Sequence, residues 1–468
     1  MPSPSRPRWT FAVVSLALFM ITLDNLVVTT ALPSIRVDLG ASIQALEWTV
    51  NAYTLSFAVL LLPAAALGDR FGRRRMFVAG LGLFTVASAL AALAPSTGAL
   101  IAARAVQGAG GAVIAPLSLT LLADAVPAGK RGLALGAWSG VSGLGVALGP
   151  VVGGAVVDGF DWTWIFWLNV PVGLALLAPA ARRLRESRGP ADRLDVPGLA
   201  LAAGGLLALT YAAVESADRG WGSAFVVGDL AAGAALLAAF VACERRAPAP
   251  MLPLHLFRSR AFAATNLVSL AMYFGVFGSI FFFAQFFQTA QGLSPLEAGL
   301  RTLPWTGMPM LVAPLAGLLS DRVGSRPLMA AGLVLQAIAV AWIASISEPS
   351  LAYSRLVVPF VMGGVGMALV FAPAANAVLG AVRPSEAGQA SGATNAIREV
   401  GGVFGVAVLA SVFSGAGSYA SPQAFNDGLV AAGWVGAAVL AAGAVAALFV
   451  PRAQPAAQRG PAVEPATA

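Results

Sequence analysis

Two charged residues lie deep inside apolar segments of the sequence, where a charge has a high energetic cost. Asp24 is about 14 residues, or about 21 Å, from the start of its segment. Arg104 is about six residues from the far end of its own segment, about 21 Å from the same side of a 30 Å hydrocarbon layer. A carboxylate at such a depth costs about 2.5 to 3.5 kcal/mol on insertion scales and is usually functional. We expect the two to line one cavity, with Asp24 taking and releasing a proton and Arg104 adjusting its proton affinity; a static ion pair is the alternative.

A second charged intrusion lies near the C-terminus. Arg398 and Glu399 are about 10 to 12 Å inside another apolar segment. Because adjacent helical residues point about 100° apart, they cannot both face one cavity. Glu399 is therefore a second candidate for proton coupling, and the alternative is that Arg398 reaches toward the interface while Glu399 contacts a neighbouring helix.

Residue counts exclude most other chemistry. The single Cys243 allows no internal disulfide, and the single His255 argues against a metal cluster or a histidine-based triad. Lys130 is the only lysine, and its surroundings, DAVPAGKRG, do not fit a phosphate-binding loop. We therefore expect no enzyme activity, no ATP use, no metal and no cofactor other than a coupling proton.

The elements that carry these charges are membrane-spanning helices. Only 10% of the 468 residues are charged and 58% are hydrophobic, which excludes an ordinary water-soluble surface. Fourteen apolar stretches are long enough to cross a bilayer, so we expect an all-α integral membrane protein. They run over 9–32, 48–67, 76–94, 98–123, 132–157, 162–180, 196–216, 224–243, 262–290, 296–319, 327–346, 353–379, 391–414 and 427–450.

Basic residues set the expected orientation. With the N-terminus inside the cell, 22 of the 28 Lys and Arg residues fall in cytoplasmic segments. We expect a multi-pass protein of the cell membrane with both termini in the cytoplasm, in contact with anionic lipid. No interleaving of basic and aromatic residues suggests nucleic acid as a partner.

An internal repeat divides the chain. Asp69, Arg70, Gly72 and Arg74 recur as Asp321, Arg322, Gly324 and Arg326, each 252 residues later. That offset fits two six-helix bundles separated by two extra helices. We expect bundles over 1–180 and 262–450, a basic loop with the extra helices over 181–261, and a disordered tail over 451–468.

Five motifs, in order, resemble the major facilitator superfamily and its fourteen-helix drug:proton antiporter branch. They are LDNLVVTTALP (23–33), GDRFGRRR (68–75), RAVQGAGG (104–111), GVALGPVVGG (145–154) and WIFWLNVPVG (164–173). Ala65 and Thr163 depart from the usual pattern, at positions that carry no mechanistic charge. The resemblance implies alternating access between the two bundles and covers residues 9–450.

Two of these motifs imply a gate and a direction of transport. In the family, the loop after the second helix holds the cytoplasmic gate, although a simple basic anchor is the alternative. The gate candidates are Asp69, Arg70, Gly72, Arg73, Arg74, Asp321, Arg322 and Gly324. The second motif, associated there with antiporters, places Gly145, Gly149, Pro150, Gly153 and Gly154 at a spacing that allows close helix packing, which alone would carry no directional meaning.

Polar and aromatic residues on helices expected to border the cavity are the candidate substrate contacts. They are Asn25, Asn51, Tyr53, Gln107, Tyr273, Phe281, Gln285 and Asn376. Such a cavity suits bulky amphipathic molecules that bind through contact area. We expect a monomeric proton-coupled exporter of hydrophobic or amphipathic drugs or antibiotics. The alternatives are an exporter of one metabolite or siderophore and a membrane receptor that transports nothing.

Overall fold

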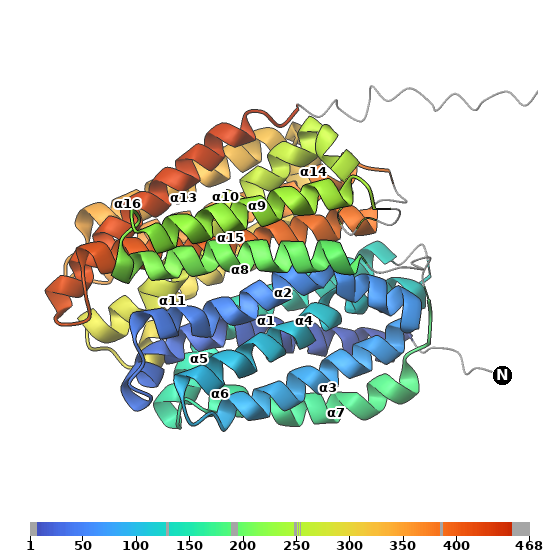
Figure 1. Ribbon diagram of the computed structural model, residues 1–468, viewed down its shortest axis with the longest axis horizontal. Coiled ribbons are helices and arrows are strands. Elements are labelled where there is room, and N and C mark those ends of the chain that lie inside the picture. The colour runs from blue at the N-terminus through green and yellow to red at the C-terminus, as the bar shows by residue number, and fades with distance from the viewer. Residues whose placement is uncertain are drawn as a thin grey trace, which may run out of the picture.

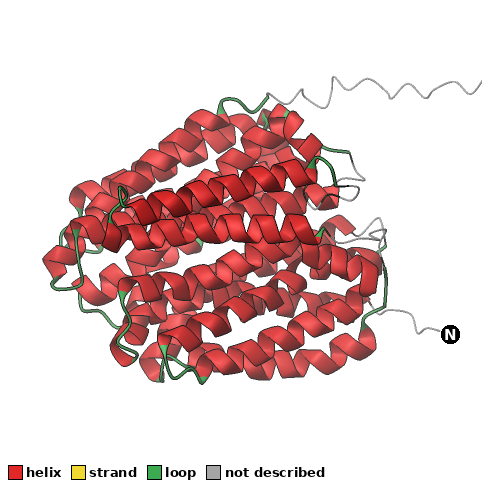
Figure 2. Cartoon of the chain, in the orientation of Figure 1, coloured by secondary structure: helices red, strands yellow, loops and turns green. Residues whose placement is uncertain are grey.

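The described chain consists of helices joined by short connections. The computed structural model describes residues 7–127, 131–188, 195–247, 250, 252, 254–383 and 387–451, and within them every regular element is helical (Figure 2). The helices are α1 (Pro7–Asp38), α2 (Ile43–Phe71), α3 (Arg73–Ala92), α4 (Thr97–Ala125), α5 (Arg131–Gly159), α6 (Trp164–Trp167), α7 (Asn169–Arg183), α8 (Val196–Arg219), α9 (Ala224–Glu244), η2 (Leu254–Arg258), α10 (Arg260–Gln285), η3 (Phe286–Ala290), α11 (Pro295–Thr306), α12 (Met308–Val323), α13 (Ser325–Ile346), α14 (Ser354–Gly380), α15 (Ala387–Ala416) and α16 (Pro422–Ala447).

Each predicted apolar stretch falls on one helix or on a broken pair of helices. Twelve spans in the described residues are long and apolar enough to cross a membrane, and the bent α2 would be a thirteenth. Helix α2 bends by 52° where Pro63 removes a backbone donor. The chain is therefore an all-helical, multi-pass membrane protein, whereas the count of fourteen spans stays a prediction. The predicted tail falls on residues 452–468, which lie outside the described part.

Serine caps and glycine turns end the helices. Ser42, Ser96 and Ser421 each accept a hydrogen bond from a backbone N–H in the first turn of the following helix. Gly72 and Gly324 separate consecutive helices with φ angles of 108° and 85°, a region of backbone space that favours glycine. The repeated loop motif therefore forms the same sharp turn twice, as its recurrence predicted.

The two ends of the helix array differ in composition. The turns at Gly72 and Gly324 and the arginine-rich segment after α7 lie at the end near the N-terminus, here called the basic end (Figure 1). The turns at Gly40 and Gly292 lie at the other end, here called the opposite end.

Helices α1–α7 and α10–α16 form two groups, with α8 and α9 beside them. Helix α8 packs against α2 of the first group and α15 of the second (Figure 1). Ser216 of α8 shares a 2.6 Å hydrogen bond with Ser411 of α15. The extra pair therefore lies along the junction between α2 and α15.

Candidate functional site

An ion pair lies in the middle of the first helix group. An Nη1–Oδ2 distance of 2.6 Å joins Arg104 of α4 to Asp24 of α1, and both side chains are buried. Their expected meeting at one depth is confirmed. The two residues were also expected to line a cavity. In this conformation, however, neighbouring side chains enclose Asp24, which is only 2% exposed.

Two amides complete the surroundings of the carboxylate. Gln107 donates to Oδ1 of Asp24 at 2.9 Å, and Asn169 at the start of α7 donates to the same oxygen at 2.6 Å. Gln107 also accepts from Nη1 of Arg104 at 2.7 Å and donates to Ser88 of α3. The Asp24 carboxylate thus accepts hydrogen bonds from Arg104, Gln107 and Asn169.

Arg104 is held by an aromatic face and a backbone carbonyl. Its guanidinium lies 4.2 Å from the centre of the Tyr53 ring and 5.7 Å from that of Phe166. Its Nε atom donates to the carbonyl of Thr49 at 3.2 Å. Because Arg104 is fixed on several sides, we define Asp24, Arg104, Gln107 and Asn169 as the buried ion cluster.

Tyr53 lies beside this cluster. The phenol lies within electrostatic range of Asp24 and Arg104 and also of Glu399 on α15. Its hydroxyl donates to the carbonyl of Ile21 at 3.3 Å. The Oε2 atom of Glu399 has no hydrogen-bond partner among the described residues. Tyr53 is thus within electrostatic range of both candidate acids.

The predicted substrate contacts occupy different environments. Gln107 and Tyr53 belong to the surroundings of the ion pair, and Phe281 is fully buried in an aromatic core beside Phe282. Asn51 is fully buried, and neither polar atom of its side chain has a partner within the described chain. In this conformation none of these four presents an open contact surface.

The other four lie nearer to open or polar surroundings. Asn25 is half-buried, with an Oδ1 atom that has no partner in the described part of the chain. Asn376 donates to Ser320 of α12 at 2.7 Å. Gln285 accepts a very short hydrogen bond from Tyr419, and Tyr273 packs beside Phe277 and Phe371.

The glycine motif brings α5 against α1 and α11. A Cβ atom on Gly145 would lie 3.0 Å from Cβ of Thr22, and one on Gly149 would lie 2.7 Å from Cβ of Leu26. Gly153 faces Val27 and Thr30 in the same row. Gly154 meets the backbone of Pro295, and Gly299 meets that of Pro150. The predicted close packing is confirmed, and it also joins the two helix groups.

We expect Gly149→Ala to destabilise the protein, because the added methyl group would overlap Leu26 and a misfit of this kind costs about 1 to 3 kcal/mol. Gly143→Ala on the same helix is the matched control, since nothing lies within 4 Å of its added Cβ. Thermal unfolding of purified protein in detergent measures both. A Gly149→Ala melting temperature equal to or above that of Gly143→Ala would contradict the packing argument.

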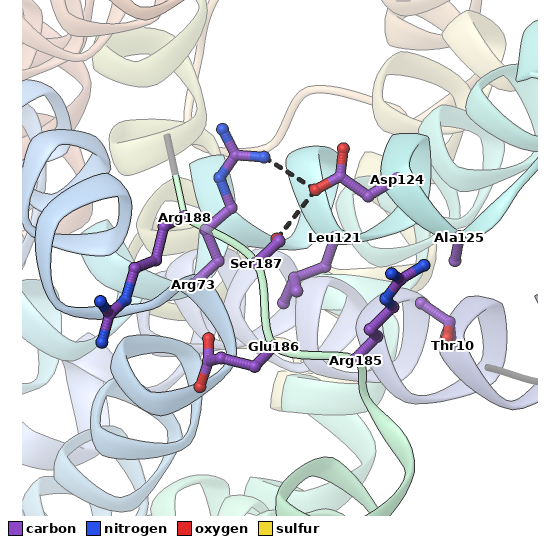
Figure 3. A pocket seen from close by; sticks show the side chains of 9 residues that line it. All are labelled: Thr10, Arg73, Leu121, Asp124, Ala125, Arg185, Glu186, Ser187 and Arg188. Atoms are coloured by element: carbon purple, nitrogen blue, oxygen red, sulfur yellow. Dashed lines mark hydrogen bonds and ion pairs between the residues drawn. The ribbon is translucent and has the colours of Figure 1, made fainter. Parts of the chain in front are cut away.

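A network of charges joins four segments at the basic end. Arg73 of α3 contacts Asp69 of α2 and Asp124 of α4, each at 2.8 Å. Ser187, in the segment after α7, donates to Asp124 at 2.8 Å, and its carbonyl accepts from the backbone N–H of Arg73 at 2.9 Å (Figure 3). Glu186 accepts from the backbone N–H of Arg74 at 3.0 Å, at the start of α3.

This network confirms that Asp69 and Arg73 lie together and adds partners that the motif does not contain. Asp124, Glu186 and Ser187 were not predicted; the lone acid within the arginine-rich RRLRESR segment is the signal that could have indicated Glu186. The network borders a cavity of about 490 Å³, which is lined by residues of α1, α3, α4 and the segment after α7 (Figure 3). Arg70 contacts the ring of Phe71. In the second copy Arg322 is exposed, and the side chain of Asp321 lies outside the described residues.

The two helix groups meet near the opposite end. Gln288 of η3 donates to the carbonyl of Thr30 in α1 at 2.9 Å. The guanidinium of Arg36 in α1 lies 4.3 Å from the ring centre of Tyr419 in the turn before α16. Burial raises the pKa of Tyr419, so its phenol stays protonated and donates to Gln285. These contacts hold the groups together on the side away from the basic end.

Comparisons of the sequence and of the fold with known proteins agree with each other. The sequence profile described as Major Facilitator Superfamily matches residues 14–406 and 269–467. The chain is 36% identical over 408 residues to the tetracenomycin C resistance and export protein of Streptomyces glaucescens, covering 86% of this chain and 75% of that protein. It is 39% identical over 413 residues to a cephamycin export protein of Amycolatopsis lactamdurans, covering 87% and 85%. The crystal structure of a D-xylose–proton symporter shares the fold, with a TM-score of 0.68 at 16% identity over 95% of this chain and 98% of that one.

Proposed function

This chain belongs to the Major Facilitator Superfamily, and on that premise we propose that it is a proton-coupled exporter of hydrophobic or amphipathic drugs or antibiotics. One observation carries the proposal: a carboxylate, Asp24, is buried against a fixed guanidinium. A buried acid is costly in a membrane protein and usually marks an ion pathway. Two relatives are named as antibiotic resistance or export proteins, which supports export as the direction of transport.

In the proposed cycle the basic end faces the cytoplasm and the two groups rock about the bilayer midplane. The contacts of Thr30, Arg36 and Gly154 then close the outer side in this conformation. Drug binding on the second group pulls α2 and Tyr53 away from the buried ion cluster. Asp24 then accepts a proton from outside and releases it inside, with Glu399 as a second acid.

The gate residues act at the cytoplasmic side in this scheme. Asp69, Arg73 and Asp124 link the ends of α2, α3 and α4 at this side, and Gly72 allows the sharp turn between two of them. The second copy, with Asp321, Arg322 and Gly324, serves the other group. The candidate contacts with substrate remain Asn25, Asn51, Tyr53, Gln107, Tyr273, Phe281, Gln285 and Asn376, of which the buried members become accessible when the groups rock.

A dedicated exporter of one antibiotic or metabolite is the second candidate, favoured by the relative named for cephamycin export. Both candidates share the remaining proposals: fourteen spans, two cytoplasmic termini, a monomer, and no need for ATP, a metal or another cofactor.

Transport in proteoliposomes tests the function. Purified protein is reconstituted in vesicles with an acidic lumen, and entry of two compounds, the basic dye Hoechst 33342 and the acidic anthracene-9-carboxylate, is followed by fluorescence against protein-free vesicles. We expect entry to depend on the pH gradient and to stop when a protonophore collapses it. Equal dye entry with and without the gradient would reject proton coupling. A growth-inhibition panel of dyes, cationic biocides and antibiotics, with and without expression, then separates broad from dedicated export.

A further inference from the structure

The second helix group contains a buried arginine with unused hydrogen-bond donors. Arg398 of α15 is 6% exposed. Its Nε and Nη2 atoms have no partner among the described residues, and its Nη1 atom makes a long 3.5 Å contact with Asn395. Buried guanidinium donors are normally satisfied, because leaving them unpaired is costly. Arg398 is therefore prepared for an acceptor that the described chain does not supply.

Aromatic rings surround this guanidinium. It lies 4.8 Å from the centre of the Phe371 ring and 5.9 Å from that of Tyr273. Tyr273 is stacked with Phe277 at 5.3 Å and with Phe371 at 6.5 Å, with interplanar angles of 19° and 24°. We call Tyr273, Phe277, Phe371 and Arg398 the aromatic–arginine cluster. Its nearly parallel rings come from α10 and α14.

One face of α10 beside this cluster is partly exposed. Along the half of α10 nearer the basic end, Leu267 is 54% exposed, while Leu270, Tyr273 and Phe277 are half-buried at the spacing of one helix face. Helix α10 packs against α14, α15 and α16 of its own group and against α1 of the other. These contacts leave the strip partly uncovered. Phe371 of α14, beside Tyr273, is 37% exposed.

Flat rings and unpaired donors together select one ligand chemistry. Parallel aromatic faces bind a planar ring system, and a guanidinium fork binds an acidic oxygen such as a carboxylate or phenolate. Glu399, the next residue, lies within electrostatic range of the guanidinium, but its direction on the helix differs by about 100°. The carboxylate of Glu399 therefore leaves the Nε and Nη2 donors of Arg398 free for a ligand.

We propose that the aromatic–arginine cluster is the substrate subsite and that it selects planar aromatic molecules that carry an acidic oxygen. This inference rests on the proposed export function and narrows its substrate class. It assigns Arg398, a residue outside the predicted substrate contacts, the role of pairing with the acidic group. Among the predicted contacts it retains Tyr273.

Two probes with the same three fused rings test this proposal: anthracene-9-carboxylate and 9-(aminomethyl)anthracene. Each is titrated by fluorescence against the full chain in lipid nanodiscs without a pH gradient. We expect the wild-type protein to bind the carboxylate at least about tenfold more tightly, as a charge-assisted hydrogen bond implies. Arg398→Gln should remove that preference while the ammonium probe binds as before. Phe371→Leu should weaken both probes alike.

Controls separate recognition from a structural role. Arg355→Gln removes an exposed arginine near the opposite end and should change neither affinity. Arg398→Lys keeps the charge and should give intermediate affinity for the carboxylate. Equal wild-type affinity for both probes, or an equal loss of both in Arg398→Gln, would overturn the proposal. Because no gradient is applied, such a result leaves proton-driven dye transport to be judged by its own assay.

Discussion

Asp24→Asn is expected to abolish transport driven by the pH gradient. The carboxylate of Asp24 is the only acid in the buried ion cluster as described, so its removal leaves no group there to exchange a proton. An amide is nearly isosteric and keeps an acceptor oxygen for Asn169 and Gln107. We therefore expect dye entry into acidic vesicles to fall to the level of vesicles without protein, while equilibrium binding of the dye stays close to the wild-type value.

Asp38→Asn is the matched control for this substitution. Asp38 ends the same helix, is exposed, and accepts from Trp162 at 2.9 Å, a bond that asparagine can still accept. Its gradient-driven transport should equal that of the wild-type protein. If Asp24→Asn protein still accumulates dye in proportion to the gradient, Asp24 is not the coupling acid, and Glu399→Gln becomes the next variant to assay.

Depth along an apolar stretch was enough to predict that Asp24 and Arg104 pair, because the helix rise is constant. It could not show which other side chains would complete the cluster. Asn169 lies 145 residues from Asp24 in sequence, so its contact depends on how α7 packs. Gln107 was predicted as a substrate contact, yet at three residues from Arg104 it shares that residue's helix face and follows it into the cluster.

Patterns within one segment were predicted well for the same reason. The row of Gly145, Gly149 and Gly153 needs only helix periodicity, and the turns at Gly72 and Gly324 need only local backbone freedom. Partners supplied by distant segments were missed, as with Asp124 and the acid in the segment after α7. Arg398 shows the same limit, because only the packed structure reveals that its donors lack partners.

Breaking the ion pair from either side is expected to destabilise the protein strongly. Arg104→Gln leaves the buried Asp24 carboxylate without a countercharge, and Asp24→Asn leaves the buried guanidinium of Arg104 unpaired. Removing one partner of a buried pair typically costs about 3 to 5 kcal/mol, since the remaining charge stays away from water. Chemical unfolding of purified protein in mixed micelles measures the cost of each single substitution.

The double variant Asp24→Asn/Arg104→Gln decides how much of that cost belongs to the pair itself. With both charges replaced by amides, no uncompensated charge remains, so the double variant should be less destabilised than the sum of the single variants by about 2 to 3 kcal/mol. Strictly additive costs would mean that the contacts of Arg104 with Tyr53 and Thr49, rather than its charge, stabilise the cluster. A large coupling free energy would show that the pair contributes to stability. Loss of gradient-driven transport in the same double variant would show that transport needs the charges as well. In the proposed cycle the charges hold the first helix group together, and their contact breaks when Asp24 takes up the coupling proton.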